Sequence, residues 1–397
     1  MAPSSNSVRC APYGVLMVAR TDEILIRVEG RVGRITLNRP ERINALSMEM
    51  INDVRSALNS WAGDRQVAQI LIDGAGERGL CAGGDIRLLY DGIRGEAIAP
   101  PAFWADEYRM NSELAHFGKP IVAYMEGITL GGGVGISGHC SIRIVTETSQ
   151  VGMPETAIGL APDVGGLFLL SRAPGELGTH AALTGARLGA ADAIAAGLAD
   201  RFLPADRLPA LTEQLRTHAL TSPADIAGLA DFREHPPPST MQFQRDWIDE
   251  CYAGDDVSTI LRRLLEHPAP SAQETGEHLS TMSPTSLKVT LAAVRRAASM
   301  TLDEVLAQDL RVCVSFLHHH DLAEGIRARL IERDGRPRWD PPRLEDVTDE
   351  QVQGYFARLD PADELWASRR LPVVAARADQ DGAMPIRTAR SGGQESH

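Results

Sequence analysis

Residues 131–139 read GGGVGISGH and closely follow residues 120–125, an apolar segment with the composition of a strand. Within it, residues 133–138 fit G-x-G-x-x-G, the pattern of a dinucleotide-binding turn, and an acid, Glu155, follows at about the expected interval. The glycines have a second interpretation, because a helix that begins among them leaves backbone N–H groups unpaired and pointing outward. Such groups can bind a phosphate or an oxyanion. The stretch therefore predicts a strand, a loop and a helix with an anion site at the helix entrance.

The flanking sequence predicts an α/β domain. Residues 24–40 alternate β-branched and polar side chains around two glycines, which is typical of a β-hairpin. Residues 47–64 have apolar side chains at helical spacing behind a candidate N-cap, Ser47. Residues 67–76 and 140–147 resemble short strands. Strands that alternate with helices favour a parallel sheet with crossover connections.

The second half of the chain has a helical pattern. We expect an alanine-rich helix, a turn at Gly189 and a second helix across residues 181–204. The chain length of 397 residues allows two domains or one domain with a large extension. The expected divisions are a flexible leader (1–21), a core domain (22–222), a helical insert (223–284), a C-terminal helical region (285–366) and a disordered tail (367–397).

Bulk composition excludes several classes of protein. The net charge of −13 and the pI near 5.4 argue against a general nucleic-acid binder. No apolar run approaches the roughly 18 residues of a membrane-spanning helix, and the first 20 residues lack the apolar region of a signal peptide. The five cysteines are widely spread without a C-x-x-C pair, which fits neither a disulfide framework nor a zinc site. We therefore expect a cytoplasmic protein with no membrane or nucleic-acid partner.

Three glycine-rich segments hold the residues that could carry chemistry. GLCAGGDI (79–86) closes a strand with small residues, and GITLGGGVGIS (127–137) leads into a helix. MPETAIGLAPDVGG (153–166) then presents two acids, Glu155 and Asp163. Two segments from separate strand–helix junctions could direct two N–H donors at one oxygen. That arrangement suits the tetrahedral or enolate intermediate of a thioester.

In this order, CAGGDI, GGGVG and MPETAIGLAPDVGG resemble the enoyl-CoA hydratase/isomerase (crotonase) superfamily. Within it they are most similar to the 3-hydroxyisobutyryl-CoA hydrolase branch. Further similarity lies in ITLNRPERINALSMEMI (35–51), ADEYRMN (105–111), ALTGARLGAADAIAAGLA (182–199), MSPTSLKVTL (282–291) and HDLAEGIRARLIERDGRPRW (320–339). The resemblance runs from about residue 22 to about residue 360. It implies an α/β fold with a crotonase-like ββα spiral core and a C-terminal helical region.

The resemblance also implies roles for individual residues. Gly84 and Gly132 would donate the two N–H groups of an oxyanion hole, so the G-x-G-x-x-G match would be a by-product of helix–sheet packing. Glu155 and Asp163 would be the catalytic acids. Glu107, in DEYRMN, matches a position that contacts the polar end of the substrate, whereas its alternative is a surface helical acid. Asp163 could instead be only a helix N-cap.

One position separates hydration from hydrolysis. Typical hydratases of the superfamily hold one water between two glutamates, of which one follows the glycine run. This chain has Gly135 at that place, and glycine cannot act as an acid or a base. It has Glu155 at the second place and Asp163 eight residues later, which favours a hydrolase. Whether Glu155 would activate water or attack the thioester itself stays open.

The coenzyme A part of the substrate carries phosphates, which favours basic residues near the cavity entrance. Candidates are Arg39, Arg42 and Arg87, each of which could equally be an ordinary surface arginine. By analogy with the superfamily, the backbone around Ala45, Ala82, Gly84 and Ile86 would line the channel for adenine and pantetheine. No metal is implied, because the two N–H donors supply the electrophile. No separate cofactor is implied either, because coenzyme A is part of the substrate.

Other reactive side chains favour structural roles. We expect Cys81 to be a small buried residue at a strand end and His139 to be a core histidine bonded to backbone. The adjacent histidines 318–320 would point in different directions on a helix, which disfavours a metal site.

The sequence thus predicts hydrolysis of a 3-hydroxyacyl-CoA thioester, with 3-hydroxyisobutyryl-CoA of valine catabolism as the implied substrate. The alternatives are an enoyl-CoA hydratase or isomerase, which would need an acid elsewhere in place of position 135, and a catalytically silent CoA-binding protein. The superfamily favours trimers and hexamers, but a C-terminal helical region could replace a neighbour's contacts and leave a monomer.

Overall fold

The computed structural model describes residues 21–95, 100–220 and 234–367. The predicted leader and the predicted disordered tail lie outside the described residues, apart from residues 21 and 367. In the described part of the chain, no helix has the length and apolar character needed to cross a bilayer.

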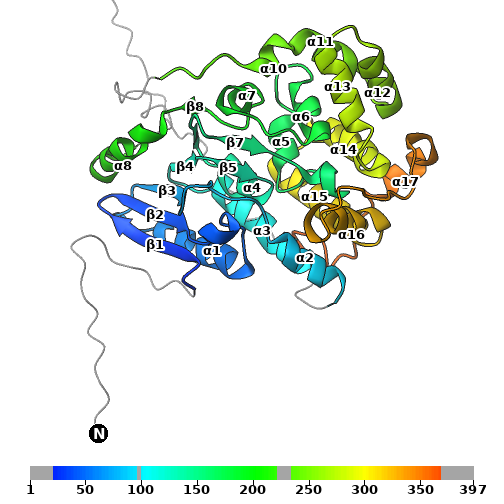
Figure 1. The fold of residues 1–397 in the computed structure, drawn as a ribbon. Helices are drawn as coiled ribbons and strands as arrows, with labels where there is room; N and C mark the ends of the chain where they lie inside the picture. Colours follow the sequence, from blue (N-terminus) through cyan, green and yellow to red (C-terminus); the bar gives the residue numbers. More distant parts are fainter. Residues whose placement is uncertain (1–20, 96–99, 221–233, 368–397) are drawn as a thin grey trace, which may run out of the picture.

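A six-stranded sheet lies at one end of the molecule (Figure 1). Its strand order is β1 (Ile24–Glu29), β2 (Val32–Leu37), β3 (Gln69–Gly74), β4 (Ile121–Met125), β6 (Ile142–Val145) and β8 (Arg201–Phe202). Strands β1 and β2 form the predicted antiparallel hairpin, and all later pairings are parallel. A separate parallel pair joins β5 (Ile128–Leu130) to β7 (Gln150–Gly152). The predicted α/β class is confirmed.

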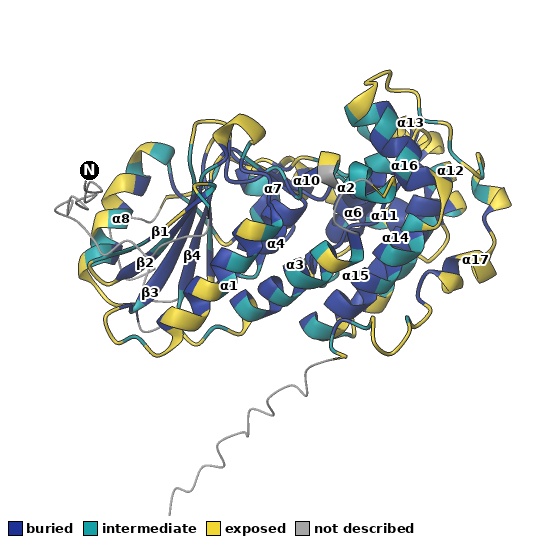
Figure 2. Cartoon of the chain, turned by 90° about the horizontal axis from the view of Figure 1, so that it is seen from below, coloured by how far each residue is buried: buried dark blue, intermediate teal, exposed yellow. Residues whose placement is uncertain are grey.

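Helices pack on both faces of this sheet. Neighbouring residues of a strand point to opposite sides, so the central strand β3 is buried on both faces. On one face, Ile70 and Ile72 of β3 join the main core with α1 (Met48–Ala62), α3 (Pro100–Ala115) and α4 (Gly132–Gly138). On the other face, Leu71 packs in a smaller core with α8 (Leu208–Thr217). Figure 2 shows the strands as a buried layer between these helices.

Helix α1 begins where the sequence predicts. The Ser47 side chain accepts a hydrogen bond from the backbone N–H of Met50 at 3.2 Å, as an N-cap does. Apolar residues then recur at helical spacing through Trp61, which is buried. The cap and the apolar stripe together fix the helix over the hairpin.

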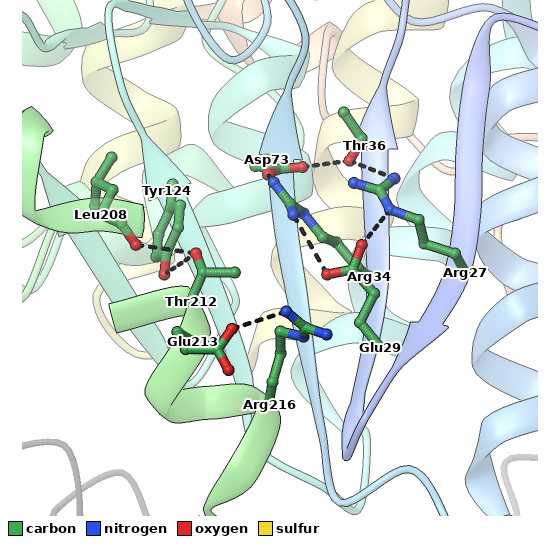
Figure 3. Close-up of polar contacts among 10 residues, drawn as sticks. All are labelled: Arg27, Glu29, Arg34, Thr36, Asp73, Tyr124, Leu208, Thr212, Glu213 and Arg216. Carbon is green, nitrogen blue, oxygen red and sulfur yellow. Dashed lines mark hydrogen bonds and ion pairs between the residues drawn. The ribbon is translucent and has the colours of Figure 1, made fainter. Parts of the chain in front are cut away.

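Polar contacts hold the outer face of the sheet (Figure 3). Asp73 of β3 accepts hydrogen bonds from Arg34 Nε at 2.9 Å and from Thr36 Oγ1 at 2.6 Å. The Tyr124 hydroxyl lies 3.1 Å from Thr212 Oγ1 of α8. Arg34, Asp73, Tyr124 and Thr212 border a cavity of about 410 Å³ that contains none of the predicted site residues.

Helices form the other end of the molecule (Figures 1 and 2). They are α2 (Ile86–Ile93), α5 (Gly166–Leu170), α6 (Leu177–Thr184), α10 (Thr240–Phe243), α11 (Arg245–Tyr252), α12 (Val257–Glu266), α13 (Pro270–Leu279), α14 (Pro284–Ala297), α15 (Leu302–Leu317), α16 (His320–Ile326) and α17 (Asp349–Gly354), with a π-helical turn at Arg327–Ile331. Helix α7 (Ala190–Ala195) lies beside the strands and contacts β7 and β8 (Figure 1). Helices α10–α13 fall in the predicted insert, and α14–α16 in the predicted C-terminal block. Both regions are largely helical over their described residues, and the division of the chain at residues 222 and 284 stays a prediction.

The prediction for residues 181–204 is partly wrong. The first helix starts earlier, at Leu177, and ends at Thr184, because Gly185 adopts a left-handed φ of 61° that stops it. The second helix is only α7, and Arg201–Phe202 form strand β8 beside β6. Sheet pairing overrides the alanine-rich local preference there.

Candidate active site

Two backbone N–H groups, those of Gly84 and Gly132, lie close together at the start of α4. The N–H groups of Gly84 and Gly132 donate to no acceptor among the described residues. A Cβ placed on Gly132 would lie 3.1 Å from the backbone nitrogen of Gly84, so the two segments are in close contact. Gly132 is also the first residue of α4, where the helix leaves N–H groups unpaired. The structure thus brings the two predicted donors together.

Glycine is required at this junction for two reasons. Gly131, just before α4, has φ of 53° and ψ of −118°, a backbone conformation that other residues rarely adopt. A Cβ on Gly131 would also lie 2.7 Å from Oε1 of Glu155. A Cβ on Gly132 would collide with Oε1 of Glu107. The two carboxyl groups therefore approach the glycine backbone directly.

The three predicted acids come from three different elements. Glu107 lies on α3, Glu155 opens the short 3-10 helix Glu155–Ile158 after β7, and Asp163 lies in the loop before α5. All three are buried. Oε1 of Glu107 and Oε2 of Glu155 have no hydrogen-bond partner in the described part of the chain. The alternative of a surface acid at position 107 is therefore wrong.

Burial raises the pKa of each of these acids. The pKa values of Glu107 and Glu155 lie well above the ordinary range, because burial disfavours the charged form and Asp163 adds like-charge repulsion. Burial raises the pKa of Asp163 to about 6, against an opposing hydrogen bond from Tyr108. Groups that titrate near neutral pH are suited to proton transfer.

Asp163 does not act as a helix N-cap. Helix α5 has Gly165 at its N-cap position, and no side chain caps it. The Asp163 carboxylate instead accepts a hydrogen bond from the Tyr108 hydroxyl at 2.6 Å. The alternative interpretation of Asp163 is therefore wrong, and the contact with Tyr108 is one that the sequence analysis missed.

The acids and the two glycines line one cavity of about 590 Å³. Most of its remaining wall is apolar, with Ile43, Met48, Leu89, Phe103, Trp104, Ile128, Leu130, Leu160, Val164 and Leu330 among the lining residues. A largely apolar cavity with a few convergent polar groups is the usual form of a small-molecule site. Its volume suits an acyl chain and part of a long carrier.

Three of the five predicted CoA-binding residues line this cavity, namely Ala82, Gly84 and Ile86. Ala45 lies outside the lining, and its carbonyl accepts a hydrogen bond from Arg39 at 2.7 Å. Arg42 is also outside the lining, and its half-exposed side chain pairs with Asp85 at 2.6 Å. The assignment of all five to coenzyme A stays a prediction.

The arginines are arranged differently from the prediction. Arg39 is buried and pairs with Asp85 at 3.2 Å, so it is a structural residue rather than a surface one. Arg87 is exposed. Arg187 and Arg329 line the cavity instead, and neither forms an ion pair with another described residue. Both lie in segments whose sequence resembles the superfamily, but the sequence did not indicate that they line the cavity.

The remaining reactive side chains are structural. Cys81 is fully buried, which raises the pKa of its thiol to about 12. His139 Nε2 lies 2.8 Å from the Val164 carbonyl oxygen, and burial lowers the pKa of this histidine to about 4. His319 stacks on Tyr355, and His320 contacts the Arg338 carbonyl oxygen at 2.9 Å. Over residues 21–95, 100–220 and 234–367, no three His, Cys, Asp or Glu side chains gather as metal ligands would.

Residues 32–356 match the enoyl-CoA hydratase/isomerase family, and the chain belongs to this family. Its relatives include the mitochondrial 3-hydroxyisobutyryl-CoA hydrolases of Rattus norvegicus and Homo sapiens. The rat enzyme is 40% identical over 347 residues, which cover 85% of this chain and 90% of the relative. The human enzyme is 38% identical over 348 residues, which cover 86% and 90%. The resemblance inferred from the sequence is confirmed.

Two similar crystal structures confirm the fold. One is described as a carnitinyl-CoA dehydratase from Mycobacterium thermoresistibile, with a TM-score of 0.81, 46% identity and coverage of 87% of this chain and 98% of that one. The other is described as an enoyl-CoA hydratase from Rhodobacter sphaeroides 2.4.1, with a TM-score of 0.80, 42% identity and coverage of 87% and 99%. The predicted crotonase-like core with its C-terminal helical region is correct.

Proposed function

We propose that this chain hydrolyses 3-hydroxyisobutyryl-CoA to 3-hydroxyisobutyrate and coenzyme A, a step of valine catabolism. The observation that carries the proposal is a single cavity that is lined by Glu155 and Asp163 together with Gly84 and Gly132. The similarity to 3-hydroxyisobutyryl-CoA hydrolases, which covers 85–86% of this chain, supports the choice of acyl group.

In the proposed reaction the thioester carbonyl oxygen accepts hydrogen bonds from the N–H groups of Gly84 and Gly132. One such donor typically contributes about 2.7–4 kcal/mol to the stabilisation of the oxyanion. Glu155 then removes a proton from water as that water attacks the carbonyl carbon. In a second version, Glu155 attacks the carbon itself and water opens the resulting anhydride. Either way the C–S bond breaks, and Asp163 helps to deliver a proton to the departing thiolate.

Glu107 would select the hydroxyl group of the substrate. Its free Oε1 lies beside Gly132, at the place where the acyl chain would leave the carbonyl carbon. A substrate hydroxyl there gives this buried oxygen a hydrogen-bond partner, whereas a plain acyl chain leaves it without one. An unpartnered buried polar group is costly, and that cost discriminates between the two substrates.

A hydratase is the second candidate, and the position of Glu107 favours it. Hydration of an enoyl-CoA needs two carboxyl groups at one water, and Gly135 removes the usual second one. Glu107 is a carboxyl group in the same cavity as Glu155 and could replace it. A third candidate is a silent CoA-binding protein, which would lose no activity when Glu155 is replaced.

The deciding experiment offers the purified protein 3-hydroxyisobutyryl-CoA and crotonyl-CoA in separate assays. Release of free thiol from the first, without loss of enoyl absorbance from the second, supports the hydrolase. Loss of enoyl absorbance without thiol release supports the hydratase with Glu107 as the second acid. Binding of both compounds with neither reaction supports the silent protein.

Location and assembly are further proposals. We propose a cytoplasmic location, which the four described cysteines support because all four are free and buried. For the assembly we keep the trimer or hexamer of the superfamily and the monomer as the choices. Light scattering on the purified chain decides between them.

A further inference from the structure

The turn that carries Asp163 is strained, and contacts from other elements of the fold hold it in place. Val164 has φ of 52° and Gly165 has φ of 73°. A β-branched residue such as valine rarely adopts a positive φ, and such strain persists only where surrounding contacts impose it. The Gly165 N–H donates to Asp309 Oδ2 at 2.8 Å, and His139 Nε2 contacts the Val164 carbonyl oxygen at 2.8 Å.

Tyr108 fixes the carboxylate itself. This side chain is fully buried on α3, and its hydroxyl lies 2.6 Å from Asp163 Oδ2 and 3.3 Å from Cys313 Sγ. A hydroxyl has one proton to donate, and a carboxylate is a far stronger acceptor than sulfur. The proton is therefore donated to Asp163.

We propose that Tyr108 is a positioning residue, whose hydroxyl sets the direction of the Asp163 carboxylate and favours its ionised form, on a turn that Asp309 of α15 holds in place. Its catalytic consequence rests on the proposed function, in which Asp163 is one of the two catalytic acids. Helices α3 and α15 pack against each other, so α15 helps to build the site although none of its residues lines the cavity.

The groups around Asp163 show why this one hydrogen bond matters. The acids around Asp163 are Glu107 on α3, Glu155 on the 3-10 helix and Asp309 on α15, and burial together with the negative charge of Asp163 raises the pKa of each. His139 on α4 faces the turn with its pKa lowered to about 4, so it brings no positive charge at neutral pH. Among the described side chains, only Tyr108 and the weaker donor Cys313 lower the pKa of Asp163.

The test replaces Tyr108 with phenylalanine and follows the titration of Asp163 by NMR of aspartate labelled with ¹³C at the carboxyl group. The Asp163→Asn variant identifies the resonance. Loss of a hydrogen bond to a charged group should raise the titration midpoint by about one pH unit or more. The matched control is Tyr124→Phe, because the Tyr124 hydroxyl is also buried but bonds to Thr212 on the outer face of the sheet (Figure 3). That control should leave the midpoint unchanged.

A second variant of the chain keeps the shape of the tyrosine side chain at position 108. Incorporation of 3-fluorotyrosine at position 108 makes the hydroxyl a stronger donor and should lower the Asp163 midpoint. If Tyr108→Phe does not fold, this protein decides the question. An unchanged midpoint in the proteins that fold overturns the proposal.

The titration needs no substrate, so it is independent of the acyl group that the enzyme takes. If the chain releases thiol from 3-hydroxyisobutyryl-CoA, the basic limb of its kcat profile, where Asp163 loses the proton that it delivers to the thiolate, should move to higher pH in Tyr108→Phe. A shifted midpoint in a protein without thioesterase activity would keep the positioning role and reject the proposed function. A shifted midpoint with an unmoved kcat profile would reject the catalytic consequence.

Discussion

Val164 fills the space into which a side chain at position 135 would project. A Cβ placed on Gly135 would lie 2.9 Å from the Val164 Cβ and 3.0 Å from the Asn111 side-chain nitrogen. Real Cβ atoms do not approach other atoms so closely. The place where a hydratase would carry its second glutamate is therefore both without an acid and without room for one.

Gly135→Glu should consequently not create a hydratase. The added side chain must displace Val164 and the turn beside it, and overpacking of this kind typically costs about 1–3 kcal/mol of folding free energy. We expect a lower melting temperature and no loss of enoyl absorbance from crotonyl-CoA. Gly63→Ala is the control, because a Cβ there meets no atom within 4 Å. Efficient hydration by a variant of unchanged stability would contradict this account of the position.

Glu155→Gln should separate activity from stability. Loss of a general base or nucleophile typically lowers turnover by about 10²–10⁴-fold. The folded state should not suffer, because the variant replaces a buried carboxyl group whose Oε2 has no partner among the described residues. Thiol release and thermal unfolding measure the two effects. Glu49→Gln, at an exposed acid on the cavity wall, should leave both unchanged, and equal effects of the two substitutions would argue against a catalytic Glu155.

The raised pKa of Asp163 should appear in the pH dependence of stability. Its pKa is about 6 in the folded chain, against an ordinary value of 3.8. Between about pH 3.8 and about pH 6, the Asp163 carboxyl group keeps a proton in the folded state that it releases in the unfolded state. Its contribution to stability is therefore complete below about pH 3.8 and is lost as the pH rises through about 6.

Asp163→Asn removes this dependence. Relative to the variant, the wild-type chain should lose on the order of 1–3 kcal/mol of unfolding free energy between pH 4 and pH 7. Urea unfolding of both proteins at the two pH values measures the difference. A difference that stays constant with pH would mean that the carboxyl group titrates in the folded state much as it does in the unfolded state.

Gly132→Ala tests the oxyanion site without removing a charge. The new methyl group would meet Oε1 of Glu107 and lie 3.1 Å from the Gly84 nitrogen, where the substrate oxygen should bind. We expect thiol release to fall by about 100-fold or more, as on loss of one oxyanion donor. Gly189→Ala is the control, because nothing lies within 4 Å of a Cβ at that position. An unchanged kcat in Gly132→Ala would place the carbonyl group elsewhere.

Glu107→Leu tests the hydroxyl specificity. Leucine removes the buried acceptor, so 3-hydroxyisobutyryl-CoA should lose its advantage over isobutyryl-CoA. The ratio of kcat/KM for the two substrates should fall by about tenfold or more, since an unpaired buried polar group costs about 1–3 kcal/mol. The isobutyryl compound is the internal control for general damage. Equal losses on both substrates would show that Glu107 does not contact the hydroxyl group.

Local sequence signals predicted the elements that depend on neighbours in the chain. The Ser47 side chain bonds to a residue only three positions along the chain, and the hairpin ladder pairs residues that are 3 to 13 positions apart. The sequence also placed α4 within the glycine run, because a left-handed residue such as Gly131 and a helix start are both local backbone properties. The prediction of the end of α6 was wrong, because the sequence analysis placed the turn at Gly189 whereas the helix stops at Gly185.

By itself, then, the sequence determined the strand–helix alternation, the glycine segments and the presence of Glu155 and Asp163. Only the tertiary structure decided what surrounds them. Tyr108 and Cys313 stand 55 and 150 residues from Asp163 in the chain, and both contact its carboxylate. The burial of Arg39 also depends on residues that are far from it in the chain. The same is true of the space beside Gly135, which Val164 occupies. Periodicity and turn chemistry describe a residue's near neighbours, whereas burial, pKa and free space depend on the elements that pack across it.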